Sequence, residues 1–248
     1  MTTNVKPKSG AAKPAAKGGM SQNQLLIIIG VIAVVIVALV IVIALSGQGS
    51  NISIDYASLN PQRTQDGAFI IGDPNAPITL VEFADWACPH CQEYHPTIQR
   101  YIKEFVETGR ARFEFRMFPT AGGEVTVFLG RIAQCVDELQ PGAFWDAYNL
   151  FFDLGATNQY TQNAGRTIAQ RLNLSYSALL SCTENANQVT IDTNAGRSLG
   201  VTGTPAIAVR YANGPMQWIN YGGTEFNRGS VSFDVLAAVT NAANGIVQ

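Results

Sequence analysis

Two cysteines separated by two residues, Cys88 and Cys91, are the strongest chemical signal in the chain. Cysteines at this spacing close a disulfide across the first turn of a helix, and a helical pattern follows them directly. The free N–H groups and the dipole at a helix N-terminus favour an anion, so this position stabilises the Cys88 thiolate. His90 adds to that effect when charged, and Pro89 suits the first helical position. A stabilised thiolate makes the disulfide easy to reduce, which is typical of a pair that oxidises other thiols.

The same four residues also permit an inert disulfide or half of a zinc site. Structural zinc takes four ligands, usually from two such pairs. His90 and His95 are the only further candidates nearby, and the sequence has no second pair of cysteines or histidines at ligand spacing. The sequence therefore predicts redox chemistry at a Cys88–Cys91 disulfide, with no metal and no separate cofactor.

The cysteines follow a predicted strand and open a predicted helix. Residues 78–84 (ITLVEFA) are nearly all apolar, which is typical of a strand buried on both faces. Apolar side chains then recur on one face of a helix that ends near Gly109. Residues 112–118 alternate between apolar and charged side chains, which predicts a strand with one buried face. Strand, helix and strand in this order indicate a parallel crossover.

The middle of the chain is helical throughout in its pattern, and we expect a large helical insertion at about 122–199. Two strands are predicted after it, at 206–211 and 217–221, and an Asn-Gly dipeptide between them is typical of a hairpin. A last helix is expected at about 230–244. The sequence thus predicts an α/β fold, with a mixed sheet interrupted by helices.

A membrane anchor is predicted near the N-terminus. Residues 25–45 are 21 consecutive uncharged residues, and a rise of about 1.5 Å per residue lets them span a hydrocarbon core of about 30 Å. Four lysines and no acid precede this run, which places the N-terminus in the cytoplasm. A cleaved signal peptide is the alternative, although its apolar core is usually about 7–15 residues long. Both interpretations place the remaining chain outside the cytoplasm.

Composition and charge predict three further parts of the chain besides the anchor: a tail, a stalk and a folded domain. Residues 1–24, rich in Ala, Lys, Gly and Pro, predict a disordered cytoplasmic tail. Residues 46–65 predict a flexible stalk, followed by a folded domain at 66–248. The apolar content of 47% and charged content of 14% fit a folded protein. Positive charge is not clustered in that domain, which argues against a nucleic-acid partner.

One carboxylate, Glu82, interrupts the apolar strand six residues before Cys88. Burial on both faces of the strand is expected to raise the pKa of Glu82, because a low dielectric disfavours the charged form. A glutamate that faces water at the edge of the sheet is the alternative. We favour the buried position.

At this point the chain resembles DsbA-like proteins of the thioredoxin fold, over about residues 66–246. The likeness rests on Cys-Pro-His-Cys after a strand, on Thr204-Pro205 at the start of a late strand, and on residues 72–77 (GDPNAP). Cys88 and Pro205 lie 117 positions apart, much farther than in a plain thioredoxin. The resemblance implies a thioredoxin-like α/β fold with a large helical insertion, here preceded by the predicted transmembrane helix.

The resemblance also implies roles for single residues. It implies a cis peptide bond before Pro205, in a loop where Thr204 and Pro205 offer backbone groups to a substrate chain. It assigns to Glu82 the part of a buried acid that exchanges protons near the cysteines. Apart from the resemblance, Trp86 is a candidate for lining a peptide groove, because it is expected to be the most exposed of the aromatic side chains, whereas core packing is expected for most of the others.

Cys135 and Cys182 are left for each other if Cys88 pairs with Cys91. An even number of cysteines in an exported domain predicts disulfides, because that environment is oxidising. Closing the loop between Cys135 and Cys182 contributes about 4 kcal/mol through the chain entropy of the unfolded state. A structural disulfide is the favoured interpretation; a redox relay to the active site and two buried free thiols are the alternatives.

The function expected from the resemblance is that of an enzyme, a thiol–disulfide oxidase that introduces disulfides into exported proteins. Reduced exported proteins are its expected substrates, and a quinone-linked membrane protein of DsbB or VKOR type its expected reoxidant. The expected location is the cell membrane, as a single-pass monomer with a cytoplasmic N-terminus and an extracytoplasmic catalytic domain. A disulfide reductase or isomerase is the second hypothesis. A non-catalytic tethered binding module, with the disulfide as a staple, is the third.

Overall fold

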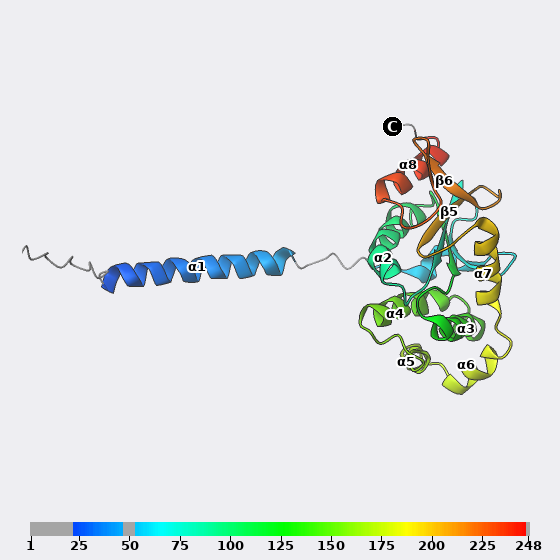
Figure 1. Cartoon of the computed structure of the whole chain (residues 1–248), viewed down its shortest axis with the longest axis horizontal. Helices are drawn as coiled ribbons and strands as arrows, with labels where there is room; N and C mark the ends of the chain where they lie inside the picture. The colour runs from blue at the N-terminus through cyan, green and yellow to red at the C-terminus, as the bar shows by residue number, and fades with distance from the viewer. Residues whose placement is uncertain (1–21, 47–52, 247–248) are drawn as a thin grey trace, which may run out of the picture. The chain divides into compact units, whose positions relative to one another are not determined.

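The structure of the chain is a computed structural model that describes residues 22–46 and 53–246. Two compact units divide the chain, Met1–Asn51 and Ile52–Gln248. All the residues that the sequence predicts to carry the chemistry lie in the second unit (Figure 1).

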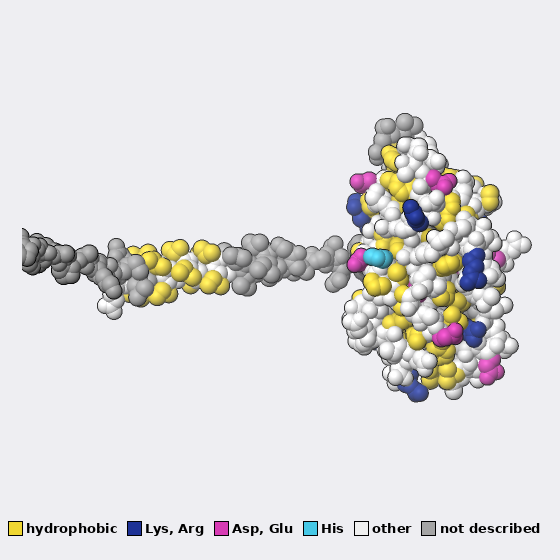
Figure 2. Space-filling view, viewed as in Figure 1, with side chains coloured by type: hydrophobic (Ala, Val, Ile, Leu, Met, Phe, Trp, Pro, Cys, Tyr) yellow, Lys and Arg dark blue, Asp and Glu magenta, His cyan; other side chains and the backbone are white. Residues whose placement is uncertain are grey.

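The first unit contains the helix α1 (Gln22–Ser46). Its side chains are described at Gln22, Asn23 and residues 26–37, and the apolar ones in this stretch are exposed (Figure 2). No helix among the residues that the structure describes is long and apolar enough to cross a membrane. The predicted tail at 1–24 lies outside the described residues up to the start of α1.

A seven-stranded sheet runs through the second unit, in the order β1-β2-β4-β3-β5-β6-β7. The strands are β1 (Gln62–Arg63), β2 (Phe69–Gly72), β3 (Ile78–Ala84), β4 (Arg112–Met117), β5 (Ala206–Tyr211), β6 (Gln217–Tyr221) and β7 (Thr224–Phe226). The central strand β3 pairs in parallel with β4 and antiparallel with β5. The predicted parallel crossover is therefore confirmed, and the cysteines follow a strand that is buried along its whole length.

Helices cover this sheet, and those between Gly123 and Leu199 form the predicted insertion between β4 and β5. The helices are α2 (Pro89–Tyr101), α3 (Gly123–Leu139), α4 (Phe144–Ala156), α5 (Ala164–Arg171), α6 (Tyr176–Thr183), α7 (Gln188–Leu199) and α8 (Phe233–Ala243), with the short turns η1 (Tyr56–Leu59) and η2 (Ile102–Val106). Figure 1 shows α3 to α6 grouped at one end of the sheet and α7 beside it. The predicted hairpin and last helix are confirmed as the antiparallel pair β5–β6 and as α8.

The predicted stalk at 46–65 is wrong from the turn η1 onward. Tyr56 is buried and stacks on Trp145, with ring centroids 5.7 Å apart. Leu59 is buried as well, and β1 pairs with the edge of β2. Tyr56 thus packs against α4, almost 90 positions along the sequence, so this segment belongs to the folded unit. Residues 47–52 lie outside the described part of the chain.

Burial of β4 on both faces corrects the prediction of a strand with one buried face. The side chains of Glu114 and Arg116 are fully buried. The guanidinium of Arg116 forms ion pairs with three carboxylates, those of Glu114, Asp66 and Asp192. Asp192 comes from α7, which covers this face of the strand. Charged side chains can lie inside a protein when their opposite charges lie there too, and the strand pattern does not reveal this.

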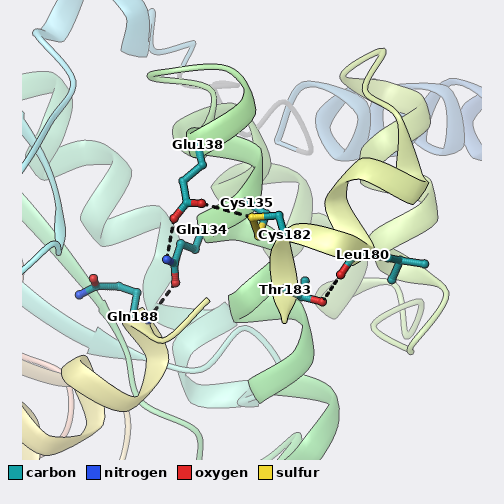
Figure 3. The surroundings of a disulfide bond; sticks show 7 residues. All are labelled: Gln134, Cys135, Glu138, Leu180, Cys182, Thr183 and Gln188. Carbon is teal, nitrogen blue, oxygen red and sulfur yellow. Dashed lines mark hydrogen bonds between the residues drawn. A yellow bond between two sulfur atoms is a disulfide. The ribbon is translucent and has the colours of Figure 1, made fainter. Parts of the chain in front are cut away.

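A disulfide joins α3 to α6 within the insertion (Figure 3). It links Cys135 to Cys182, whose Cα atoms are 5.8 Å apart, so the predicted pairing is confirmed and free thiols are excluded here. Figure 3 shows the Glu138 carboxylate beside the bridge, where it accepts a hydrogen bond of 2.7 Å from the Gln134 amide. The bridge ties the short helix α6 to the buried helix α3. This position supports the structural interpretation of the pair.

Candidate active site

The chain leaves β3 and turns into α2 at Cys88. Cys88 is the N-cap residue of α2 and Pro89 occupies the first helical turn, as the sequence predicts. The backbone N–H of Cys88 donates to the carbonyl oxygen of Asp85 at 2.9 Å, which closes the turn. Cys88 is 7% exposed and Cys91 is 0% exposed, and both are free thiols in the structure. Cys88 is therefore the sulfur that an incoming group meets first.

Cys91 lies one turn deeper, in surroundings that hold its proton. Burial raises the pKa of the Cys91 thiol, and the nearby Glu82 charge raises it further. Hydrogen bonds from the Asp85 backbone and the Thr204 side chain lower it, with a smaller total effect. Cys91 therefore needs a proton acceptor to become a nucleophile and a proton donor when it leaves as a thiolate.

Glu82 is the buried acid beside this thiol. Its side chain is fully buried in β3, and burial raises its pKa to about 8. The Tyr148 hydroxyl donates to its Oε2 at 3.4 Å, whereas Oε1 has no hydrogen-bond partner among the described residues. The position excludes the alternative of a glutamate that faces water, and the predicted rise in pKa is confirmed. Glu82 is largely protonated at neutral pH, which suits a group that exchanges protons.

Tyr148 also connects Glu82 to His95. Its hydroxyl lies 3.4 Å from His95 Nδ1, and the His95 ring stacks on Phe152 with centroids 4.0 Å apart. Burial lowers the pKa of His95 to about 4, so the imidazole is neutral at pH 7. Tyr148 comes from α4 in the insertion, so the insertion supplies part of the surroundings of the buried acid.

A second loop faces the cysteines. The Thr204–Pro205 peptide bond is cis, as the resemblance implies. The Thr204 carbonyl oxygen accepts a hydrogen bond from Cys88 Sγ at 3.5 Å. A pocket of about 240 Å³ opens beside them, lined by His90, Glu93, Tyr94, Thr204, Pro205, Gly229 and Ser230. The larger cavity of about 770 Å³ lies near Thr79, at the other end of β3 from the cysteines.

His90 lies at the mouth of this pocket. Its side chain is 79% exposed, and its Nδ1 atom is 3.4 Å from the Glu93 carboxylate. On the face of the folded unit seen in Figure 2, basic and acidic side chains are interspersed, and neither sign forms a continuous patch. The site thus presents a sulfur, a cis-proline loop and a small pocket of mixed polarity to a partner.

A family model described as thioredoxin matches residues 64–214, which is more than half of the chain. The chain belongs to the thioredoxin family. The matched range contains Glu82, Cys88, Cys91 and Pro205, the residues that the geometry brings together.

Comparison with single proteins places this thioredoxin-family chain among DsbA-like folds. The crystal structure of alpha-DsbA1 from Wolbachia pipientis superimposes with a TM-score of 0.60 at 19% identity, over 74% of this chain and 94% of that one. Disulfide bond formation protein D of Bacillus subtilis (strain 168) is 29% identical over 99 residues, 39% of this chain and 43% of that protein. The fold is therefore that of the DsbA-like thiol–disulfide oxidoreductases.

A third relative is a longer protein, and only part of it is similar to this chain. The Na(+)/H(+) antiporter NhaA 3 of Salinispora tropica is 25% identical over 178 residues, which is 69% of this chain and 26% of that protein. This thioredoxin-family chain thus spans less than half the length of the curated relatives described here.

Trp86 does not line a groove, which corrects the prediction of a substrate-binding role. It is 1% exposed, and its ring stacks on Phe151 and Phe115 with centroids 4.5 and 5.4 Å away. Helix α4 supplies an aromatic surface that covers the loop before the cysteines, and the sequence does not show that this surface lies there. In this thioredoxin-family chain Trp86 anchors the active-site loop to the core.

Sequence reasoning missed Asp85, which is fully buried between β3 and the cysteines. Its carboxylate accepts hydrogen bonds from the backbone N–H groups of residues 120–122, in the turn after β4. The one signal in the sequence is an acid placed directly after a buried strand and three residues before Cys88. These three donors lie at least 35 positions away, so no local pattern identifies them.

Proposed function

We propose that this protein is a thiol–disulfide oxidase that acts through Cys88 and Cys91. A substrate thiolate attacks Cys88 Sγ, forms a mixed disulfide and breaks the Cys88–Cys91 bond, so Cys91 leaves as a thiolate. A second substrate thiolate then attacks the substrate sulfur of the mixed disulfide, and Cys88 leaves. The products are a substrate disulfide and the reduced pair, with two electrons moved from substrate to enzyme.

The observation that carries this proposal is the unequal placement of the two sulfurs. Cys88 is the N-cap residue of α2 and the more accessible of the two sulfurs. Cys91 is buried behind it, beside an acid that is protonated at neutral pH. This arrangement gives an accessible sulfur for the first exchange and a proton donor, Glu82, for the Cys91 thiolate that leaves.

The cis-proline loop supports a peptide substrate. The loop places backbone groups of Thr204 next to Cys88, and an extended chain binds such groups as one strand binds another. We propose reduced, unfolded exported proteins as substrates. The name of the relative from Bacillus subtilis, which refers to disulfide bond formation, agrees with this direction of exchange.

The predicted anchor completes the proposal. Residues 25–45 are uncharged and follow four lysines, so we propose a single-pass protein whose catalytic domain is extracytoplasmic and monomeric. A membrane partner of DsbB or VKOR type would accept two electrons from the reduced pair and pass them to a quinone, because tethering raises the effective concentration of the two proteins. Resistance of the protein to alkaline carbonate extraction tests the anchor; release into the soluble fraction contradicts it.

The direction of exchange is tested by mixing the oxidised chain with a reduced, unfolded protein that needs disulfides to fold. The proposal predicts that substrate disulfides appear at the rate at which thiols appear on Cys88 and Cys91. The reductase or isomerase hypothesis predicts the reverse, in which the reduced chain opens substrate disulfides and the oxidised chain transfers none.

A further inference from the structure

The Asp85 carboxylate receives five hydrogen bonds inside the protein. Its Oδ2 atom accepts from the successive backbone N–H groups of residues 120–122 at 2.8, 2.7 and 3.1 Å. Its Oδ1 atom accepts from the Ala87 N–H at 2.9 Å and from the Thr126 hydroxyl at 2.7 Å. One side chain thus joins the loop before Cys88, the turn after β4 and the first turn of α3.

Thr120 extends this connection to the cis-proline loop. Its hydroxyl oxygen is 2.6 Å from the hydroxyl oxygen of Thr204. Thr204 in turn contacts both reactive cysteines, because its carbonyl oxygen accepts from Cys88 Sγ and its side chain hydrogen-bonds with Cys91. Hydrogen bonds thus link the Asp85 carboxylate to the Thr120 backbone, the Thr120 hydroxyl to the Thr204 hydroxyl, and Thr204 to the two cysteines.

The backbone of Asp85 contacts the same pair from the other side. Its carbonyl oxygen accepts the Cys88 N–H at 2.9 Å, and its backbone hydrogen-bonds with Cys91. Asp85 therefore contacts the turn into α2 directly. It is connected to the Thr204 loop, on the other side of the sulfurs, through Thr120.

We propose that Asp85 and Thr120 are positioning residues that hold the Thr204 loop against Cys88 and Cys91. Neither residue touches the substrate. They act by keeping the Thr204 side chain in hydrogen-bond contact with Cys91, which favours the Cys91 thiolate. Because the turn after β4 leads into α3, the helical insertion thereby contributes to the reactivity of a cysteine pair that lies outside it. The inference rests on the proposed exchange at Cys88, and deepens it.

The step that tests this role is the attack of Cys91 on a mixed disulfide at Cys88. In the reduced full-length chain the Cys88 thiolate attacks one sulfur of oxidised glutathione, whose S–S bond breaks; one glutathione stays on Cys88 and the other leaves as a thiolate. The Cys91 thiolate then attacks Cys88 Sγ, the Cys88–Cys91 bond forms, and glutathione leaves as a thiolate. Acid quenching and mass measurement follow the mixed disulfide as it forms and disappears, at several pH values.

Thr120→Val removes one hydroxyl at an exposed position and keeps the N–H that Asp85 binds. We expect its release of glutathione to be about two- to tenfold slower, the range that corresponds to one hydrogen bond, with the pH profile moved upward. Asp85→Asn, whose amide cannot accept from all five donors, is expected to show the same change and a lower melting temperature. The control is Asp153→Asn, an exposed acid on α4, which should behave as wild type.

A combined Asp85→Asn, Thr120→Val chain distinguishes a shared path from separate effects. Since both residues act through Thr204, its release rate should be no slower than that of Asp85→Asn alone. Wild-type release by Thr120→Val overturns the proposal, and this variant decides the matter alone should Asp85→Asn fail to fold. Failure of the wild-type chain itself to release glutathione through Cys91 would instead count against the proposed function.

Discussion

Replacing Cys88 with Ser is expected to reduce disulfide transfer to the uncatalysed background, whereas replacing Cys91 with Ser should trap a mixed disulfide. Cys88 is the sulfur that an incoming thiolate reaches, and Cys91 lies fully buried behind it. Without Cys91 the adduct at Cys88 has no internal thiol to resolve it. Non-reducing electrophoresis and mass measurement of the chain after reaction with a disulfide-containing peptide report both outcomes.

The second disulfide offers the matched control for this experiment. Replacing both Cys135 and Cys182 with Ala removes two sulfurs that bridge α3 and α6. If the bridge is structural, this variant loses stability by about 2–4 kcal/mol and keeps its transfer activity. If Cys88→Ser retains the biological function of the protein, the tethered binding module is the better hypothesis.

Replacing Glu82 with Gln is expected to remove a loss of stability that the wild type shows as the pH rises from about 4.5 to 8. The pKa of Glu82 is about 8 in the folded chain, against an ordinary value of 4.5. The folded state therefore keeps a proton that the unfolded state releases. This contribution to stability is fully present below pH 4.5 and is lost as the pH rises through 8.

Urea unfolding at pH 5 and pH 9, on either side of most of this range, measures the effect. A pKa that differs by one between the folded and unfolded states corresponds to about 1.4 kcal/mol, so Glu82→Gln should exceed the wild type by a few kcal/mol at pH 9. The matched control is Glu93→Gln, at a side chain that is 77% exposed on α2. His95 affects stability only in acid, because its pKa is lowered to about 4. The stability that its neutral form contributes is lost as the pH falls through 4. Equal pH dependence of the Glu82→Gln variant and the wild type would contradict the buried position of this acid.

Local patterns were sufficient for the strand at 78–84, for the helix that begins after Cys88 and for the hairpin near the C-terminus. Each depends on neighbours within a few positions, where apolar spacing and turn residues carry the information. The cis bond before Pro205 came from the resemblance, since the residues around it indicate only a turn. The reactive pair and its acid could thus be located before the structure was known.

The rest of the site depends on contacts between distant segments. The alternating pattern of β4 placed Arg116 toward water because its partner carboxylates lie 50 and 76 positions away. Trp86 was expected to be exposed because the aromatic surface of α4 that covers it belongs to the insertion. Asp85 finds four of its five donors only after β4 has folded beside β3. A periodic pattern shows which side chains share a face but not what packs against that face.

The most direct test of the central claim is a redox titration of the full-length chain in glutathione buffers. Alkylation and mass measurement report Cys88 and Cys91 separately from Cys135 and Cys182. An oxidase requires a potential above about −200 mV for the Cys88–Cys91 pair, and the structural interpretation requires the second pair to remain oxidised throughout. A potential near or below about −270 mV for the Cys88–Cys91 pair would contradict the account and indicate a reductase.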